Sequence, residues 1–357
     1  MNARVTAILI VLLALLGGGA LLYHQQGQTQ RPAEAGALGQ TLLKGLKAAE
    51  VSAIQIREPG STLTLERKDE RWVVAERAGF PADLDRVRDF VLKALELKIG
   101  QTEPIGDKDR ARLNLDASGT QVEFKDAKGA SLARFIAGKK FFKREPENPD
   151  QAAGDGRFVL LSEDPGRVVV VSNALAQATA KSAVWVSRSG LAVEKVQSLE
   201  YRPPAGGDGW KIERPGDNAD WMLAGAKAHE KLEITKANAA AYSLASLDLA
   251  DVAPRDLKPE DSGLDQPAVL AATTFDGLSY TVHVGKLAGE QYYVAVSVAG
   301  EPKTEGKDAE ERGRKLAERL ARERSLAGHV LLVAKNRLDD VLKPRAELLA
   351  RPQENKK

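Results

Sequence analysis

The sequence predicts an α+β protein: a tandem, duplicated domain of mostly antiparallel sheet with packed helices, preceded by one N-terminal transmembrane helix. A strand-like segment that leads through a hairpin to Trp72 is followed by a similar segment that leads to Trp221. The pair Leu115-Asp116 recurs as Leu264-Asp265 at the same offset of 149 residues, the spacing of a duplicated domain rather than of a short solenoid repeat. Both copies are rich in short apolar runs of period two, the pattern of half-buried strands.

The length fits this organisation. A chain of 357 residues has room for two domains of roughly 150 residues after a short N-terminal segment. We expect five parts: an anchor at 1–23, a linker at 24–45, a first unit at 46–190, a second unit at 191–352 and a tail at 353–357.

The composition is that of a globular protein and excludes several function classes. The chain is 43% hydrophobic and 29% charged, with a net charge of +2, so it lacks the basic excess that nucleic-acid binding requires. Cysteine is absent, which excludes disulfides, thiol catalysis, cysteine-based zinc or iron–sulfur sites and a lipid-modified N-terminal cysteine.

The N-terminal segment is a nearly unbroken apolar run without charge. It occupies residues 5–22, beginning at Val5 and ending at Leu22, and as a helix it would span roughly 27 Å, enough for the hydrocarbon core of a membrane. We therefore expect a single-pass protein of the cytoplasmic (inner) membrane, with its N-terminus inside and the bulk of the chain periplasmic. A cleaved signal peptide is the alternative, with an apolar stretch at 5–16 and a cleavage site at Gly18-Gly19-Ala20.

The elements of the first unit follow from apolar periodicity. Alternation and β-branched runs predict strands over residues 54–56, 63–65, 72–74, 122–124, 132–136, 158–161 and 168–171. Pro81-Ala82-Asp83 is expected to open a helix. Its apolar face would carry Leu84, Val87, Val91 and Leu95. A short helix from about Asn173 should close the unit.

The second unit repeats this order. Strands are expected over residues 196–201, 210–213, 221–223, 268–275, 279–284, 292–296 and 329–333. Asp276-Gly277 is a strong hairpin signal between two of them. Thr235 is expected to cap a helix. The inner face of this helix would carry Ala237, Ala240, Ala241 and Leu244.

Each unit carries an insertion of its own. Residues 141–156 form a segment rich in Pro, Asp, Glu and Gly in the first unit. In the second unit, residues 301–324 place opposite charges four residues apart, at Glu310/Arg314, Glu311/Lys315 and Glu318/Arg322. This pattern predicts an exposed, charged helix with only Leu316 and Leu320 on its apolar edge. A solvated surface helix accounts for the pattern, and a contact surface for a partner is the functional alternative.

We predict no catalytic, cofactor-binding or metal-binding residues, and no cofactor. The four histidines, His24, His229, His283 and His329, are not at metal-ligand spacing. His283 is expected within a strand and His329 at the start of one, so we interpret both as structural.

Other candidate motifs also favour structural roles. Gly138-Lys139 and Gly285-Lys286 lack the upstream glycine of a phosphate loop, so we expect each glycine to end a strand with a tight exit. The carboxylate pairs Asp83/Asp85, Asp107/Asp109 and Asp339/Asp340 lie at expected helix ends, which disfavours a metal or glycosidase role. Trp72 and Trp221 start strands, so core packing is favoured over stacking on a sugar.

These residues carry a resemblance to a bacterial family known as domain of unknown function 4340. The resembling segments are residues 66–72 before the Pro81-led helix, and Gly263-Leu264-Asp265-Gln266-Pro267 before a hairpin that ends in Val284-Gly285-Lys286. The resemblance covers about residues 50–190 and 195–350, although residues 114–118 lack the Gly and Pro of the second copy. It implies an extracytoplasmic protein, often associated with an export-type ABC transporter and the auxiliary component named for gliding motility, and it implies no catalytic residues.

The expected function is therefore that of a membrane-anchored, non-enzymatic accessory protein of an ABC-type, gliding-motility-like transport system. Its expected partners are the membrane, an ABC permease and the auxiliary subunit. A cell-envelope module that binds polysaccharide or peptidoglycan in a groove between the repeats is the alternative. An enzyme of unrecognised type is a third hypothesis.

Overall fold

The computed structural model describes residues 38–144, 146–149, 151–302 and 309–350. The expected anchor at 5–22, most of the linker, His24 and the whole tail lie outside these residues. Within the described part of the chain, no helix is long and apolar enough to span a membrane. Contacts divide the chain into two compact units. One holds residues up to Val51 together with Gln55–Gly60 and Asp89–Thr179; the other holds Ser52–Ile54, Ser61–Arg88 and Ala180–Lys357. The boundary expected between residues 190 and 191 stays a prediction.

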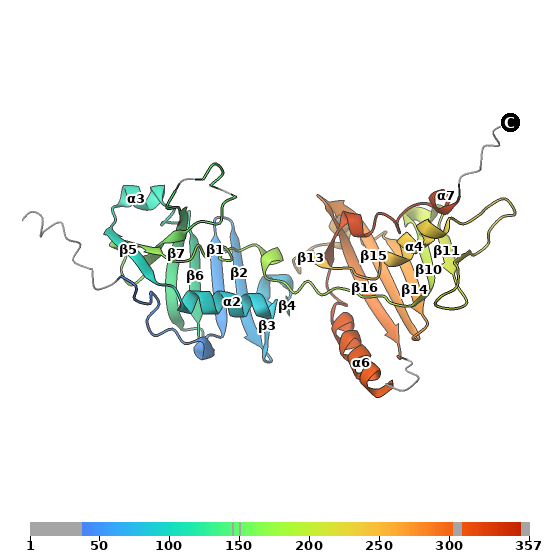
Figure 1. The fold of residues 1–357 in the computed structure, drawn as a ribbon, viewed down its shortest axis with the longest axis horizontal. Coiled ribbons are helices and arrows are strands. Elements are labelled where there is room, and N and C mark those ends of the chain that lie inside the picture. Colours follow the sequence, from blue (N-terminus) through green and yellow to red (C-terminus); the bar gives the residue numbers. More distant parts are fainter. Residues whose placement is uncertain (1–37, 145, 150, 303–308, 351–357) are drawn as a thin grey trace, which may run out of the picture. The chain divides into compact units, whose positions relative to one another are not determined.

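The first sheet has nine strands in the order β4-β3-β2-β1-β6-β7-β8-β9-β5 (Figure 1). Their bounds are β1 Ala53–Glu58, β2 Ser61–Lys68, β3 Arg71–Val74, β4 Phe80–Pro81, β5 Ile99–Pro104, β6 Thr120–Lys125, β7 Ser131–Phe141, β8 Gly156–Leu161 and β9 Arg167–Val171. The seven strands expected from periodicity are all present. The two additional strands, β4 and β5, are edge strands with few buried residues, so their sequences carry no alternation to detect.

Helix α2 (Leu84–Leu95) crosses one face of the first sheet (Figure 1). Asp83 caps it as expected, because its carboxylate accepts from the backbone N–H groups of Asp85 and Arg86 at 3.1 and 3.2 Å. The expected apolar face is confirmed for Val87 and Val91 and wrong for Leu84. Leu84 is 52% exposed, and the buried residues are Val87, Phe90, Val91 and Ala94. The Phe90 ring stacks 6.0 Å from Phe124 of β6, so the buried side of the helix includes Phe90, whereas Leu84 at the helix start is exposed.

The remaining helical segments of the first sheet region are short. They are α3 Asp107–Arg112 and the 3₁₀ turns η1 Ala48–Glu50, η2 Ala75–Arg77 and η3 Ser182–Val184. The helix expected from about Asn173 is wrong, because residues 173–181 form turns and only Ser182–Val184 is helical. The Asn173 side chain accepts from the Leu175 N–H at 2.8 Å, which favours a turn over a helix.

The second sheet has eight strands in the order β12-β11-β10-β14-β15-β16-β17-β13. Their bounds are β10 Val196–Arg202, β11 Trp210–Glu213, β12 Met222–Leu223, β13 Leu249–Val252, β14 Ala268–Thr274, β15 Leu278–Ala288, β16 Gln291–Gly300 and β17 Leu331–Ala334. Residues 276–277 make the expected hairpin between β14 and β15, with Gly277 at φ 84°. Strands β11, β10, β14, β15 and β16 pair antiparallel in this order, and so do β6, β7 and β8 of the first sheet, as the predicted class requires.

The helices of the second sheet region are α4 Ile234–Tyr242, α5 Pro259–Ser262, α6 Ala309–Ser325 and α7 Arg345–Leu348, with 3₁₀ turns η4 Pro204–Gly206 and η5 Lys335–Arg337. The inner face expected for α4 is confirmed: Ala237, Ala240, Ala241 and Leu244 are all buried. The expected cap is wrong. Glu233 is the residue that precedes the helix, and the Thr235 hydroxyl donates to the Glu233 carboxylate at 2.8 Å instead of accepting from the backbone.

The two sheets share one strand order. In each sheet, an initial hairpin lies beside a run of hairpin-connected strands, and a strand from the middle of the sequence, β5 or β13, closes the far edge. A main helix, α2 or α4, precedes that edge strand, and a short helix, α3 or α5, follows it. This correspondence agrees with the repeat expected from the two Trp and two Leu-Asp positions.

Candidate functional site

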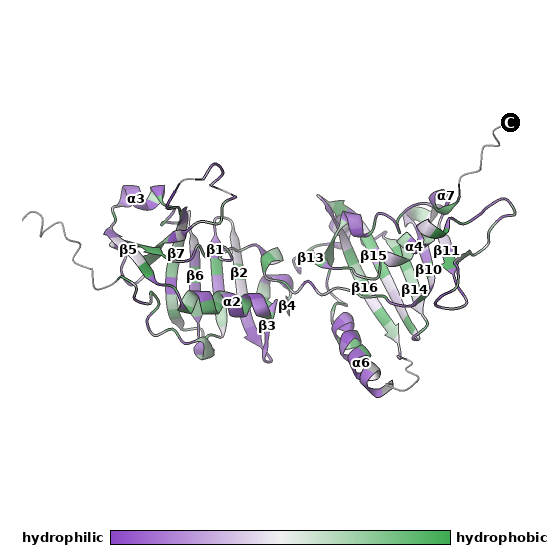
Figure 2. Ribbon diagram, viewed as in Figure 1, coloured by the Kyte–Doolittle hydropathy of each residue, from purple (hydrophilic) through white to green (hydrophobic). Residues whose placement is uncertain are grey.

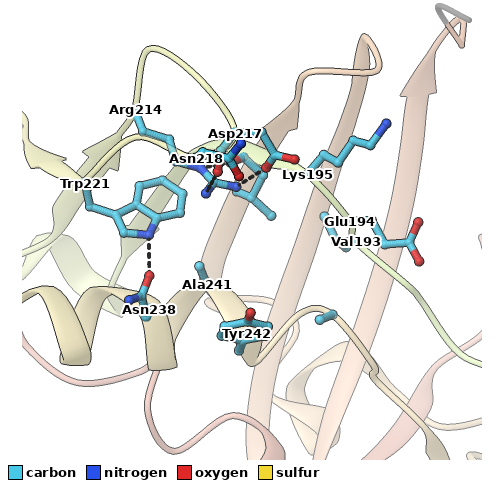
Figure 3. A pocket seen from close by; sticks show the side chains of 12 residues that line it. Val193, Glu194, Lys195, Arg214, Asp217, Asn218, Trp221, Asn238, Ala241 and Tyr242 are labelled. Carbon is cyan, nitrogen blue, oxygen red and sulfur yellow. Dashed lines mark hydrogen bonds and ion pairs between the residues drawn. The ribbon is translucent and has the colours of Figure 1, made fainter.

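A pocket of about 390 Å³ opens in the second unit (Figure 3). Its walls come from three places: the segment 193–196 that leads into β10, the loop 214–221 between β11 and β12, and helix α4. The lining residues are Val193, Glu194, Lys195, Val196, Arg214, Asp217, Asn218, Trp221, Asn238, Ala241, Tyr242 and Ala245. The pocket has the size of a small-molecule site, typically ~300–1,000 Å³.

Arg214 organises the loop wall of this pocket. Its Nε donates to the Val196 carbonyl at 2.8 Å, its Nη2 donates to the Asp217 carboxylate at 2.8 Å, and its Nη1 donates to the Asp217 carbonyl. The guanidinium also lies 4.7 Å from the centre of the Trp221 ring, a favourable cation–π position. These contacts fix the loop because a planar guanidinium can bond in several directions while it stacks.

Trp221 joins the loop to helix α4. Its indole N–H donates to the Asn238 side-chain oxygen at 3.0 Å, an interaction visible in Figure 3. The Trp221 side chain is only 5% exposed. Core packing is therefore confirmed for Trp221, which at the same time forms part of the pocket wall. Trp72, for which core packing was also expected, is only half-buried.

The mouth of the pocket carries exposed polar and aromatic groups. Tyr242, at the last position of α4, is 75% exposed. Asn218 and Asn238 are also exposed. Among the residues that the structure describes, no partner holds the Tyr242 hydroxyl, the Asn218 amide or the NH₂ group of Asn238. These three groups are therefore available to a ligand.

The charges along the pocket are balanced. Lys195 lies 3.1 Å from Asp276, Glu194 lies 2.7 Å from Arg319, and Arg214 is paired with Asp217. Lys195 also has a left-handed backbone, at φ 50°, which is unusual for a residue other than glycine. The pocket consequently presents no unpaired charge.

A buried carboxylate ties this region to helix α6. Glu323 is 0% exposed, and it accepts from the Tyr280 hydroxyl at 3.0 Å and from the Ala192 N–H at 2.9 Å. Arg319 lies 3.7 Å from the same carboxylate. Burial has the largest effect on the pKa of the Tyr280 hydroxyl and raises it, and the negative charge of Glu323 raises it further. The hydroxyl therefore stays protonated and donates its hydrogen bond to Glu323. The bonds connect α6 to β15 and to the segment that lines the pocket.

Sequence reasoning missed Glu323 because it treated the helix as an exposed charged segment. Leu320 is 3% exposed, as expected for the apolar edge, and Leu316 is half-buried. Glu323 follows them at the spacing of the same helix face, three residues after Leu320. An acidic residue in line with the two leucines is the signal that could have identified it.

The histidines stay apart from the pocket. His229 is exposed, His283 lies half-buried in β15, and His329 is half-buried two residues before β17. Burial lowers the pKa of His329. Within the described residues, no group of three potential metal ligands comes together.

The carboxylate pairs lie at chain turns. Asp83 caps α2, and Asp107 and Asp109 occupy the first turn of α3, as expected for helix ends. Asp339 and Asp340 follow η5 and pair with Lys335 and Lys343 at 3.2 and 2.6 Å.

The two Gly-Lys sites are corrected. Gly138 and Gly285 do not end strands; each lies inside a long strand, β7 or β15, next to a shift in register with the following strand. A Cβ at Gly138 would come within 2.3 Å of the Leu113 carbonyl oxygen, and one at Gly285 within 2.2 Å of the Ser262 oxygen. The glycines are thus required by the close approach of the short helices α3 and α5.

The family model described as Domain of unknown function (DUF4340) matches residues 72–267, more than half of the chain. The chain belongs to this family. No curated protein and no solved structure matches the chain. The DUF4340 match includes every residue that lines the pocket, whereas α6 and Glu323 lie beyond its C-terminal end.

Proposed function

We propose that this DUF4340 protein is a non-enzymatic accessory component of an ABC-type, gliding-motility-like transport system. In this proposal, the apolar run at residues 5–22 anchors it in the inner membrane with the N-terminus inside, and both sheet regions lie in the periplasm. The resemblance described above supports the transport partner. The shared strand order of the two sheets supports a tandem duplication, and in this proposal the two copies serve as a scaffold.

The observation that carries the proposal is the way helix α6 is held. The helix has 17 residues and is largely hydrophilic (Figure 2). Its inner side is fixed by Leu320 and by the buried Glu323. A charged helix can stay soluble without such a connection, but it would not keep a fixed orientation. The buried carboxylate gives the outer face of α6 a defined position, which suits a surface that a partner recognises.

The outer face of α6 carries both signs of charge. Its exposed charged residues include Glu311, Arg314, Lys315, Glu318 and Arg322. Of these, Lys315 and Glu311 are paired at 2.7 Å on the helix surface. Mixed exposed charges favour an interaction whose specificity and rate depend on complementary charges and weaken with salt. We assign this face as the docking surface for the permease or the auxiliary subunit.

Affinity isolation tests the proposal. The full-length chain, tagged at its C-terminus, is isolated from native membranes, and co-purifying proteins are identified by mass spectrometry. We expect an ABC permease or its auxiliary subunit. Reversal of two α6 charges, in the double variant Lys315→Glu/Arg322→Glu, should reduce their recovery at least several-fold.

A matched variant controls for the change in net charge. Arg255 and Lys258 are also exposed and lie before α5, away from α6 in the sequence. The double variant Arg255→Glu/Lys258→Glu should leave recovery unchanged. Absence of both partners from the wild-type sample would contradict the proposed function. An equal loss of partner recovery in the two double variants would contradict the docking surface on α6 but not the proposed function.

A further inference from the structure

We propose that the pocket between residues 193–196, the loop 214–221 and α4 binds an uncharged sugar ring of an envelope or exported glycan. This site lies within the second unit, and it does not depend on the transport partnership proposed above. Three properties of the pocket point to this ligand class: its balanced charge, its free amide and hydroxyl groups, and its exposed aromatic ring.

The charge balance selects an uncharged ligand. Each charged residue of the lining already has an opposite charge, at 3.1 Å for Lys195, 2.7 Å for Glu194 and 2.8 Å for Arg214. An ionic ligand would have to displace one of these partners or leave its own charge unpaired. Both outcomes cost free energy, although less than in a buried site because Lys195 and Glu194 are 51% and 63% exposed. A neutral molecule keeps all three pairs intact.

The free polar groups match a ligand with many hydroxyls. The amides of Asn218 and Asn238 offer N–H donors, and the Tyr242 hydroxyl can both donate and accept. A sugar hydroxyl likewise donates and accepts, so it can bond to either kind of group. The Asn238 oxygen is already held by the Trp221 indole, which leaves its NH₂ group directed by a fixed side chain.

The exposed Tyr242 ring supplies the apolar contact that a sugar ring needs. A tyrosine that is 75% exposed contributes little to the core of the protein. Ala241 and Ala245 line the pocket beside it, and their small side chains leave room for a ring to lie against the tyrosine. The C–H face of a pyranose is apolar, whereas its edge carries hydroxyls. The geometry therefore offers an aromatic face for one part of the ligand and amides for the other.

The walls are ordered before any ligand arrives. Arg214 fixes the loop through its bonds to Val196 and Asp217, and Trp221 fixes the loop to Asn238. A site that is already in place loses less conformational entropy on binding, which benefits a weak ligand such as a short sugar.

The test uses the full-length chain in a detergent whose headgroup is not a sugar. The probes are neutral trisaccharides of glucose, galactose, mannose and N-acetylglucosamine, with a trimer of galacturonic acid as the anionic comparison. Binding is followed by calorimetry and by tryptophan fluorescence, since Trp221 lines the pocket. We expect saturable binding of at least one neutral trisaccharide and no stronger binding of the anionic trimer.

Two variants locate the binding. Tyr242→Ala removes an exposed ring from the end of a helix, where alanine is well tolerated, and should weaken affinity roughly three- to tenfold. Met222→Ala is the matched control, because Met222 is 53% exposed in the same unit and does not line the pocket. It should leave affinity unchanged. No binding of any neutral trisaccharide, preferred binding of the anionic trimer, or equal affinity of Tyr242→Ala and wild type would each overturn the proposal.

Discussion

Glu230 provides a single-residue link between the C-terminal helix and the loop before α4. Its carboxylate accepts from Arg345 of α7 at 2.7 Å and from the Lys227 N–H at 2.8 Å. These two hydrogen bonds, of which the one from Arg345 has the larger effect, lower the pKa of Glu230 from 4.5 to about 2. A carboxylate whose pKa is lower in the folded state stabilises the fold at any pH above its unfolded-state pKa. This stabilisation is lost as the pH falls through the folded-state pKa.

The pH dependence of stability tests this link. Glu230→Gln should be less stable than wild type at neutral pH, and the difference should diminish between pH 4.5 and about 2 as the wild-type carboxylate is protonated. Urea unfolding at a series of pH values measures it. Arg345→Met should remove the same pH-dependent component. If the difference in the free energy of unfolding between Glu230→Gln and wild type stays constant from pH 7 to 2, this ion pair does not have the proposed role.

Individual residues show how far the sequence predicts local structure. Asp83 caps α2 as its spacing indicates, and the glycine of the 276–277 hairpin has its expected positive φ. Thr235 does not cap α4, because Glu233 supplies the extended residue before the helix. Gly138 and Gly285 are needed for a close backbone approach that exists only in the folded sheet. The glycine roles depend on partners that are distant in sequence, whereas the Thr235 error is a local one of two residues in the position of the helix start.

At the scale of elements, helix α6 depends on one buried side chain. Glu323 accepts from both the Tyr280 hydroxyl and the Ala192 N–H. A glutamine at this position carries no charge, so Arg319, 3.7 Å away, loses this opposite charge, and the bonds from Tyr280 and Ala192 lose a charged acceptor. Such a loss typically costs ~1–3 kcal/mol.

Hydrogen exchange tests this dependence. Glu323→Gln should accelerate amide exchange in α6 and in residues 191–196 by roughly ten- to a hundredfold, because the cost falls on local opening of both segments. Exchange in α2 should not change. Glu318→Gln, an exposed replacement on the same helix, is the control. If the amides of α6 exchange as slowly in Glu323→Gln as in wild type, the buried carboxylate does not hold the helix.

The elements differ in how well periodicity predicts them. The inner face of α4 is as expected, because alanines and a leucine at helical spacing leave only one apolar side. The buried face of α2 holds Val87 and Val91 as expected, but it also holds Phe90, which stacks on Phe124, and it leaves Leu84 exposed. Strand β5 has no fully buried residue, and the buried Leu249 and Val252 of β13 are three residues apart, so neither strand shows a period of two. Antiparallel pairing with β9 and β17 forms them. Pairing partners of this kind are set by topology rather than by local sequence.

At the scale of the whole molecule, the repeat in sequence corresponds to two sheets with one strand order. The offset between the two Trp residues and the two Leu-Asp pairs predicts this much. The pocket could not be predicted in the same way, because it combines a segment before β10, a loop after β11 and one side of α4. Its charge balance also involves Asp276 and Arg319, which are far along the chain from the residues that they pair with.

Site-specific photo-crosslinking in native membranes tests whether α6 faces a partner protein. A photo-reactive residue replaces Glu318, which is exposed on α6, or Lys258, which is exposed before α5. We expect a crosslink from position 318 to an ABC permease or its auxiliary subunit and none from position 258. No crosslink to either protein from position 318, or equal crosslinking from both positions, would contradict this expectation.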